Sequence, residues 1–149
     1  MKRVVVTGLG AVTPIGNNVA DFWEGLKTGK NGIGMITRFD VSESKYKLAA
    51  EVKDFDPLCC MDKLSAKKLD RFTQYALADS ELEGKIAPEE LGVYFGSGIG
   101  GFETFGESYK ALEEKGPRRV SPLFIPKMIS NIAAGNIAIK YHAQGPCVS

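Results

Sequence analysis

The fold is decided by residues 91–101, which read LGVYFGSGIGG. Residues 91–95 are apolar and carry strand-forming side chains, so they predict a buried strand. The strand runs directly into residues 96–101, four of which are glycine. An amphipathic stretch at residues 103–115 then predicts a helix. A strand, a glycine turn and a helix in succession are the unit from which α/β proteins are built.

The remaining elements follow from the hydrophobic period of the sequence. Strands are predicted at residues 3–7, 48–52 and 147–149, and helices at residues 18–29, 65–76 and 127–141. Their alternation indicates an α/β fold with a partly parallel sheet. Because a strand begins at the very end of the sequence, we expect residues 1–149 to be the opening part of a larger domain.

Local signals set the turns and the helix ends. Asn18 is placed to cap the first helix, and Gly29 is placed to end it. Ser65 is expected to cap the second helix, and Pro126 suits the first position of the third. The glycines of residues 8–10 predict a turn with positive φ after the first strand.

Composition excludes several classes of protein. The chain has 149 residues, 44% hydrophobic and 25% charged, with a formal net charge of +1. A near-neutral chain without interleaved exposed aromatic residues disfavours nucleic acid as a partner. No apolar run approaches the length of a membrane span, and the run at residues 4–6 is too short for a signal peptide, so we expect a cytoplasmic protein.

The chain has three cysteines, Cys59, Cys60 and Cys147, and one histidine, His142. Free thiols in a reducing compartment fit this pattern, and a Cys/His metal site is disfavoured. Cys147 could act as a nucleophile with His142 as its base, but a small residue at the start of a strand is the favoured interpretation. His142 is expected to complement the end of the third predicted helix.

Two interpretations remain open for the glycines of residues 96–101. They satisfy the dinucleotide-binding pattern G-x-G-x-x-G after a strand, yet no acidic residue ends a second strand about twenty positions later. Alternatively, the glycines bring the backbone close to a pocket or a partner, with Ile99 as the one side chain offered. The second interpretation is favoured.

Basic residues gather in two places, before and within the second predicted helix and in the loop before the third. Composition alone favours a solvated face, and the alternative is a dock for an acidic partner. The residues are Lys63, Lys67, Lys68 and Arg71 in the first group and Arg118 and Arg119 in the second.

Several strings together resemble one family. They are VVVTGLGAVTPIG at residues 4–16, WxxLxxGxxGI at 23–33, GSGIGG at 96–101, SPLFIP at 121–126 and GPCVS at 145–149. In order and approximate spacing they resemble the β-ketoacyl-[acyl carrier protein] synthase II family, and the likeness extends over essentially the whole chain.

The resemblance implies a thiolase-like fold, of which this chain would form part of the N-terminal half, a mixed, mostly parallel sheet with flanking helices. It also implies a homodimer that elongates fatty acids by Claisen condensation. An acyl group passes from acyl carrier protein to a cysteine, and malonyl carrier protein then loses CO₂ and attacks the thioester. No cofactor and no metal is implied.

For individual residues, the resemblance implies that Ile99 lines the acyl channel and that Phe124 reaches into the acyl pocket of the dimer mate. It also implies that both basic groups dock the carrier protein. No catalytic residue is expected within this chain, because the family's nucleophilic cysteine follows shortly after the position of Ser149. The chain alone is therefore expected to be inactive.

One further departure and one alternative accompany the resemblance. The helix that ends near residues 76–80 is roughly two turns shorter than in the family pattern. A non-catalytic relative that binds carrier protein, or that pairs with an active subunit, has the same motifs. The residue at the position of the missing cysteine distinguishes such a relative from an enzyme.

Overall fold

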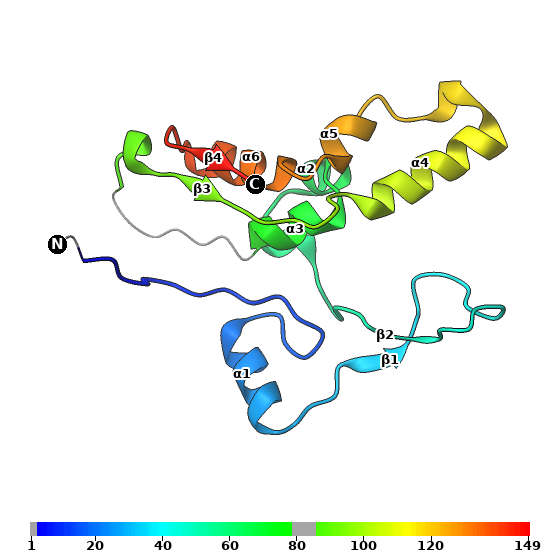
Figure 1. Ribbon diagram of the computed structural model, residues 1–149, viewed down its shortest axis with the longest axis horizontal. Helices are drawn as coiled ribbons and strands as arrows, with labels where there is room; N and C mark the ends of the chain where they lie inside the picture. The colour runs from blue at the N-terminus through cyan, green and yellow to red at the C-terminus, as the bar shows by residue number, and fades with distance from the viewer. Residues whose placement is uncertain (1–2, 79–85) are drawn as a thin grey trace. The chain divides into compact units, whose positions relative to one another are not determined.

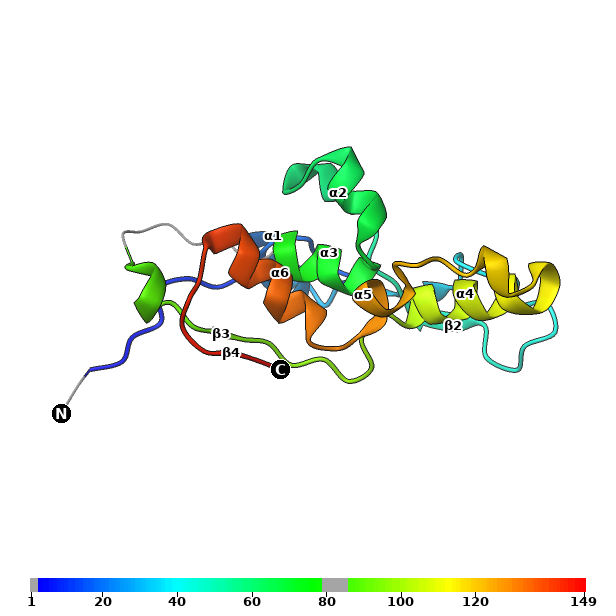
Figure 2. The ribbon, with the colours of Figure 1, turned by 90° about the horizontal axis from the view of Figure 1, so that it is seen from above.

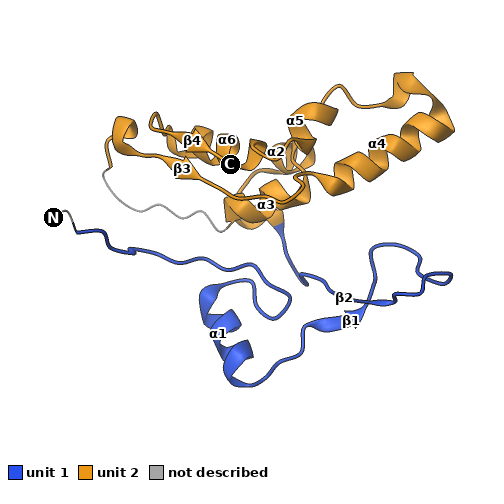
Figure 3. Ribbon diagram, in the orientation of Figure 1, with its two compact units in different colours: residues 1–56 blue, residues 57–149 orange. Residues whose placement is uncertain are grey.

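The computed structural model describes residues 3–78 and 86–149 (Figure 1). The chain divides into two compact units, Met1–Asp56 and Pro57–Ser149 (Figure 3). Among the described residues, no helix combines the length and the apolar character needed to cross a membrane. The shortening noted in the sequence near residues 76–80 falls partly on residues 79–85, which lie outside the described residues.

The first unit contains helix α1, Val19–Lys27, and an antiparallel pair of strands, β1, Ile33–Met35, and β2, Leu48–Ala50. The local signals at α1 are confirmed: the side chain of Asn18 accepts a hydrogen bond from the Asp21 amide at 2.8 Å. Gly29 follows the helix with φ of +66°, a conformation that glycine adopts without steric cost. The strand predicted at residues 48–52 is confirmed in its first three residues.

The predicted strand at residues 3–7 is wrong for this structure. Residues 3–7 form no ladder, and Val4 and Val6 are 95% and 80% exposed. β-branched residues favour an extended backbone, but a strand also needs a neighbour for its hydrogen bonds, and no described segment pairs with this one. The predicted turn is also wrong in detail, because no glycine of residues 8–10 has positive φ.

The second unit holds most of the helices. Its elements are the short 3₁₀ turns η1, Pro57–Cys59, η2, Pro88–Glu90, and η3, Pro117–Arg119, the helices α2, Lys63–Lys68, α3, Arg71–Ala78, α4, Phe102–Lys115, α5, Phe124–Met128, and α6, Ile132–Tyr141, and the strands β3, Val93–Tyr94, and β4, Cys147–Val148. β3 and β4 are parallel, with Val93 opposite Cys147. The strand predicted at residues 91–95 is confirmed only at Val93–Tyr94, and the one at 147–149 at Cys147–Val148. The helix predicted at residues 103–115 is confirmed by α4.

The core of the second unit lies between α3 and α6, which run alongside each other (Figures 1 and 2). Ala133 and Ala134 of α6 are buried to 1% exposure or less, so the small residues permit close packing. On α3 the buried residues are Thr73, Ala76 and Leu77. β3 and β4 contact α6, which completes the α/β arrangement of this unit.

The second predicted helix is divided into two, α2 and α3. Asp62 rather than Ser65 caps α2, accepting hydrogen bonds from the backbone of Leu64 and Ser65. Leu69, placed within the helix by its apolar spacing, is extended instead (φ −114°, ψ 142°). The side-chain amide of Gln74 donates to the carbonyl oxygens of Ala66 and Leu69 at the end of α2, at 2.8 and 3.2 Å.

The third predicted helix, at residues 127–141, is also divided, into α5 and α6, and Pro126 is the third residue of α5. The cause is a contact from a distant part of the chain. In a continuous helix the Met128 carbonyl would accept from the amide four residues later, but here it accepts from the Gly101 amide at 2.8 Å. A glycine contact between remote segments therefore ends α5.

Candidate functional site

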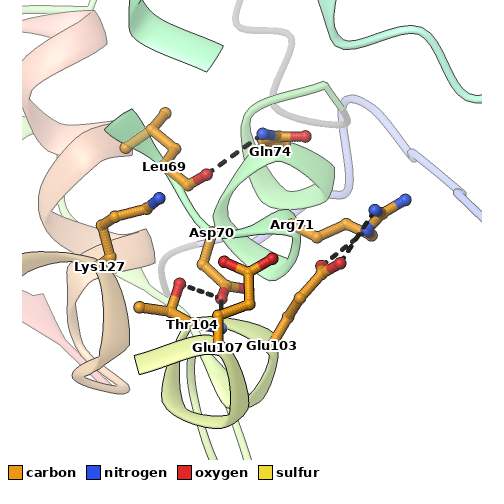
Figure 4. A pocket seen from close by; sticks show the side chains of 8 residues that line it. All are labelled: Leu69, Asp70, Arg71, Gln74, Glu103, Thr104, Glu107 and Lys127. Carbon is orange, nitrogen blue, oxygen red and sulfur yellow. Dashed lines mark hydrogen bonds and ion pairs between the residues drawn. The ribbon is translucent and has the colours of Figure 1, made fainter. Parts of the chain in front are cut away.

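A single buried carboxylate joins the N-terminal ends of two helices. Asp70 directly precedes α3 and is 6% exposed. Its Oδ1 accepts from the Phe72 amide of α3 at 3.3 Å. Its Oδ2 accepts from the Thr104 amide and hydroxyl of α4, at 2.8 and 2.6 Å (Figure 4). Both helix N-termini favour a negative charge, so the carboxylate is well placed there.

A second link is the ion pair between Arg71, which follows Asp70, and Glu103, which precedes Thr104. The Arg71 guanidinium donates to both carboxylate oxygens of Glu103, at 3.0 and 3.2 Å (Figure 4). The hydrogen bond to Glu103 raises the pKa of Arg71 above its ordinary value. Both side chains are partly exposed, so the pair contributes at most about 1 kcal/mol. We call Asp70, Arg71, Glu103 and Thr104 the Asp70 junction.

A polar recess of about 120 Å³ lies at the Asp70 junction (Figure 4). Within the described ranges, no group of three His, Cys, Asp or Glu side chains is arranged to hold a metal ion. The recess is lined by Leu69, Asp70, Arg71, Gln74, Glu103, Thr104, Glu107 and Lys127.

The glycine segment packs against the backbone that joins α5 to α6. Gly100 has φ of +84°, and a Cβ there would lie 2.3 Å from the Met128 carbonyl oxygen. A Cβ on Gly101 would lie 2.6 Å from the Lys127 carbonyl oxygen. The glycines thus allow a close approach of backbone to backbone. The Asp70 carboxylate already occupies the N-terminus of α4, where a dinucleotide phosphate would bind, so the structure argues against the nucleotide interpretation.

Ile99 and Phe124 belong to the segments that meet at this contact. Ile99 is 69% exposed. Phe124 begins α5 and is partly buried, with its ring 6.3 Å from that of Phe105. Phe105 in turn stacks on Phe102 at 6.4 Å. Phe102 and Phe105 carry only a weak signal in the sequence, an apolar spacing of three along a helix.

The basic residues form two separate groups rather than one patch. Lys63, Lys67 and Lys68 are exposed on α2, whereas Arg118 and Arg119 are exposed on η3, beyond the far end of α4 (Figures 1 and 2). None of these five forms an ion pair with an acidic residue of the described ranges.

Lys127 of α5 joins the α2 group, because its Nζ donates to the Lys67 carbonyl oxygen at 3.3 Å. No cluster around Lys127 is visible in the sequence, and only its hydrogen bond to Lys67, 60 positions away in the chain, reveals it. Arg71 is bound to Glu103, and its role in docking stays a prediction.

Cys147 and His142 show no catalytic arrangement. Cys147 is exposed on β4, and His142 ends α6 in the left-handed conformation, with φ of 53°. The capping position predicted for His142 is confirmed. No hydrogen bond joins the two side chains in the part of the chain that the structure describes.

Comparison with solved structures defines the class of the fold. A beta-ketoacyl synthase from Burkholderia phymatum matches with a TM-score of 0.77 and 26% identity, over 99% of this chain and 38% of that one. A structure of a type II PKS acyl-carrier protein in complex with its ketosynthase contains a chain that matches with a TM-score of 0.76 and 24% identity, over 97% of this chain and 41% of the matched chain. The fold is the thiolase-like fold of ketosynthases.

The sequence assigns the family within this class. The family described as "Beta-ketoacyl synthase, N-terminal domain" matches residues 1–149, so the chain belongs to it. The 3-oxoacyl-[acyl-carrier-protein] synthase 2 of Synechocystis sp. is 46% identical over 153 aligned positions, which cover 97% of this chain. The chain spans 37% of the length of that relative.

Proposed function

We propose that residues 1–149 are the N-terminal part of a β-ketoacyl-[acyl carrier protein] synthase II that elongates fatty acids. The identity of 46% over 97% of the chain to a synthase of this type carries the proposal. In the proposed reaction, a cysteine of the full-length enzyme takes the acyl group from its carrier. Malonyl carrier protein loses CO₂, and its carbanion attacks the thioester. The products are a 3-oxoacyl carrier, two carbons longer than the acyl group, and the free thiol.

This chain supplies binding surfaces rather than reacting groups. Its one histidine ends α6, and the cysteines Cys59, Cys60 and Cys147 are not at the family's nucleophile position. We propose that the nucleophile follows the position of Ser149, as in the family pattern. The free thiols of the described structure suit a cytoplasmic location.

Acyl carrier protein is the proposed partner of the two basic groups. α4 has 14 residues and separates the groups by on the order of 20 Å. A specific interface buries about 800 Å² per partner, a patch roughly 28 Å across, so one carrier protein could contact both groups. The matched ketosynthase that is in complex with its acyl-carrier protein supports the same kind of partner.

Ile99 and Phe124 are the proposed walls of the acyl pocket, with Phe124 extending toward a dimer mate. The partly buried ring of Phe124 and the exposure of Ile99 leave both available for such contacts. The parallel β3–β4 pair, covered by α6, is the proposed start of a mostly parallel sheet in a homodimeric enzyme.

A condensation assay tests the proposed reaction. The full-length protein should convert acyl and malonyl carrier proteins to a 3-oxoacyl product with release of CO₂, whereas residues 1–149 alone should form none. Condensation by the 149-residue chain would contradict the assignment of the nucleophile. Absence of product with the full-length protein would contradict the function.

A binding titration tests the docking groups. The double substitution Lys67→Glu and Lys68→Glu should weaken binding of acyl carrier protein by about tenfold or more, because it reverses two exposed charges facing an acidic partner. The effect should shrink at high salt, which screens exposed charges. The double substitution Lys45→Glu and Lys47→Glu, at exposed lysines of the first unit, is the matched control. Equal weakening by the control would remove α2 as the dock.

A further inference from the structure

The Asp70 carboxylate is more buried and better bonded than a simple helix cap requires. At 6% exposure it accepts backbone hydrogen bonds from the first turns of both α3 and α4. It also accepts the Thr104 hydroxyl at 2.6 Å, a short hydrogen bond to a charged group. The start of α4 is therefore fixed relative to α3 by one side chain.

The start of α4 in turn fixes the glycine segment. Gly101 directly precedes α4, and the ideal position of a Cβ on it lies 3.0 Å from Asp70 Oδ2. The Gly101 amide is bound to the Met128 carbonyl, and the Gly100 amide to the Ser97 hydroxyl at 3.0 Å. Ile99 therefore lies in a short turn that the Ser97–Gly100 hydrogen bond closes, two residues from the contact with Asp70.

The same carboxylate lies next to the proposed docking helix. α2 ends at Lys68 and Leu69 is its C-cap, so Asp70 is the second residue after the helix. Lys127, one residue before the Met128 contact, donates to the Lys67 carbonyl of α2. The Asp70 junction thus connects the backbone of α2 with the segment that carries Ile99.

We infer that Asp70, with Thr104, is a positioning element that sets where Ile99 stands and so helps to determine which acyl chain lengths the enzyme accepts. The inference rests on the proposed function and on the proposed place of Ile99 in the acyl pocket. Neither Asp70 nor Thr104 touches the substrate. Their effect is exerted through the start of α4 and the glycine segment.

The distinguishing observable is selectivity rather than rate. A cap that serves stability alone would lower the activity of a destabilised enzyme equally for every substrate. A displaced Ile99 instead changes the depth of the pocket, and one methylene in an apolar pocket changes discrimination by on the order of tenfold.

The test measures kcat/KM for a short and a long acyl carrier substrate with the full-length enzyme and its variants. Asp70→Asn and Thr104→Val should shift the long-to-short ratio by on the order of tenfold. Thr104→Ser, which keeps the hydroxyl, should restore the wild-type ratio. Thr73→Val changes a buried threonine outside the junction and should leave the ratio unchanged.

The outcomes distinguish a failure of the proposed function from a failure of the positioning role. If the wild-type protein does not condense, the proposed function fails. If the wild type condenses and the folded Thr104→Val variant keeps the wild-type ratio within twofold, the positioning role of the Asp70 junction is overturned, even if Asp70→Asn does not fold. A shift of equal size in Thr73→Val overturns it as well.

Discussion

Two buried threonines of the second unit allow a matched test of the Asp70 junction. Thr104 is 7% exposed, and its hydroxyl donates to the Asp70 carboxylate at 2.6 Å. Thr73 is wholly buried, and its hydroxyl has no hydrogen-bond partner among the described residues. Replacing either residue by valine changes one hydroxyl to a methyl group of similar size, so the two substitutions differ mainly in the lost hydrogen bond.

The two substitutions should change the free energy of unfolding in different directions. A hydrogen bond to a charged group contributes about 1.5–3 kcal/mol, so Thr104→Val should destabilise by about 2 kcal/mol. The Thr104 amide and the Phe72 amide still bind Asp70, which keeps the loss below that of an unpaired buried charge. Thr73→Val removes an unpaired buried hydroxyl and should be neutral or stabilise by up to about 1 kcal/mol.

Thermal and urea unfolding of the full-length protein, followed by far-ultraviolet circular dichroism, measure both changes. A loss of about 2 kcal/mol corresponds to a decrease in Tm of roughly 4–8 °C for a domain of 150–250 residues. If the two variants lose the same stability, or if Thr104→Val loses none, the hydroxyl of Thr104 does not hold the junction and the reasoning fails.

Two further predictions concern the backbone contact and the cap of α2. Gly101→Ala should destabilise the protein by about 1–3 kcal/mol, because its Cβ would meet the Lys127 carbonyl oxygen. Gly106→Ala, in open space on α4, should stabilise it by up to about 1 kcal/mol. The midpoints of urea unfolding measure both changes, and equal effects would contradict the close approach at Gly101. Hydrogen bonds from Ser65 lower the pKa of Asp62, so its cap is fully effective above the unfolded pKa of about 3.9 and is lost as pH falls through the lower folded value. An acid titration of the α2 amides by NMR should show this fraying, and Asp62→Asn, which still caps, should remove the dependence on pH.

Elements that depend on neighbouring residues were predictable from the sequence. α1 has its cap, its apolar face and its terminal glycine within residues 18–29, and all three act locally. The strands β3 and β4 were readable because apolar residues stand next to glycine and proline turns. The family resemblance also depended on short strings, and the family match over residues 1–149 confirms it.

Elements that depend on remote contacts were not predictable. The break between α5 and α6 results from the Gly101 amide, which takes the Met128 carbonyl from a position 27 residues earlier in the chain. Asp70 offered a partial signal, since Asp at the start of a helix is a common cap, but the apolar spacing of Leu69 and Phe72 concealed the helix start. Its second role needs Thr104, 34 residues away, which the spacing of neighbouring residues cannot reveal.

The intact mass of the full-length protein after incubation with carrier protein loaded with an acyl group tests the central claim most directly. The proposed mechanism predicts an added mass equal to one acyl group, on a cysteine beyond residue 149, which disappears when malonyl carrier protein is added. The 149-residue chain should gain no acyl group under the same conditions. An acyl group on Cys59, Cys60 or Cys147, or no acyl group on the full-length protein, would contradict it.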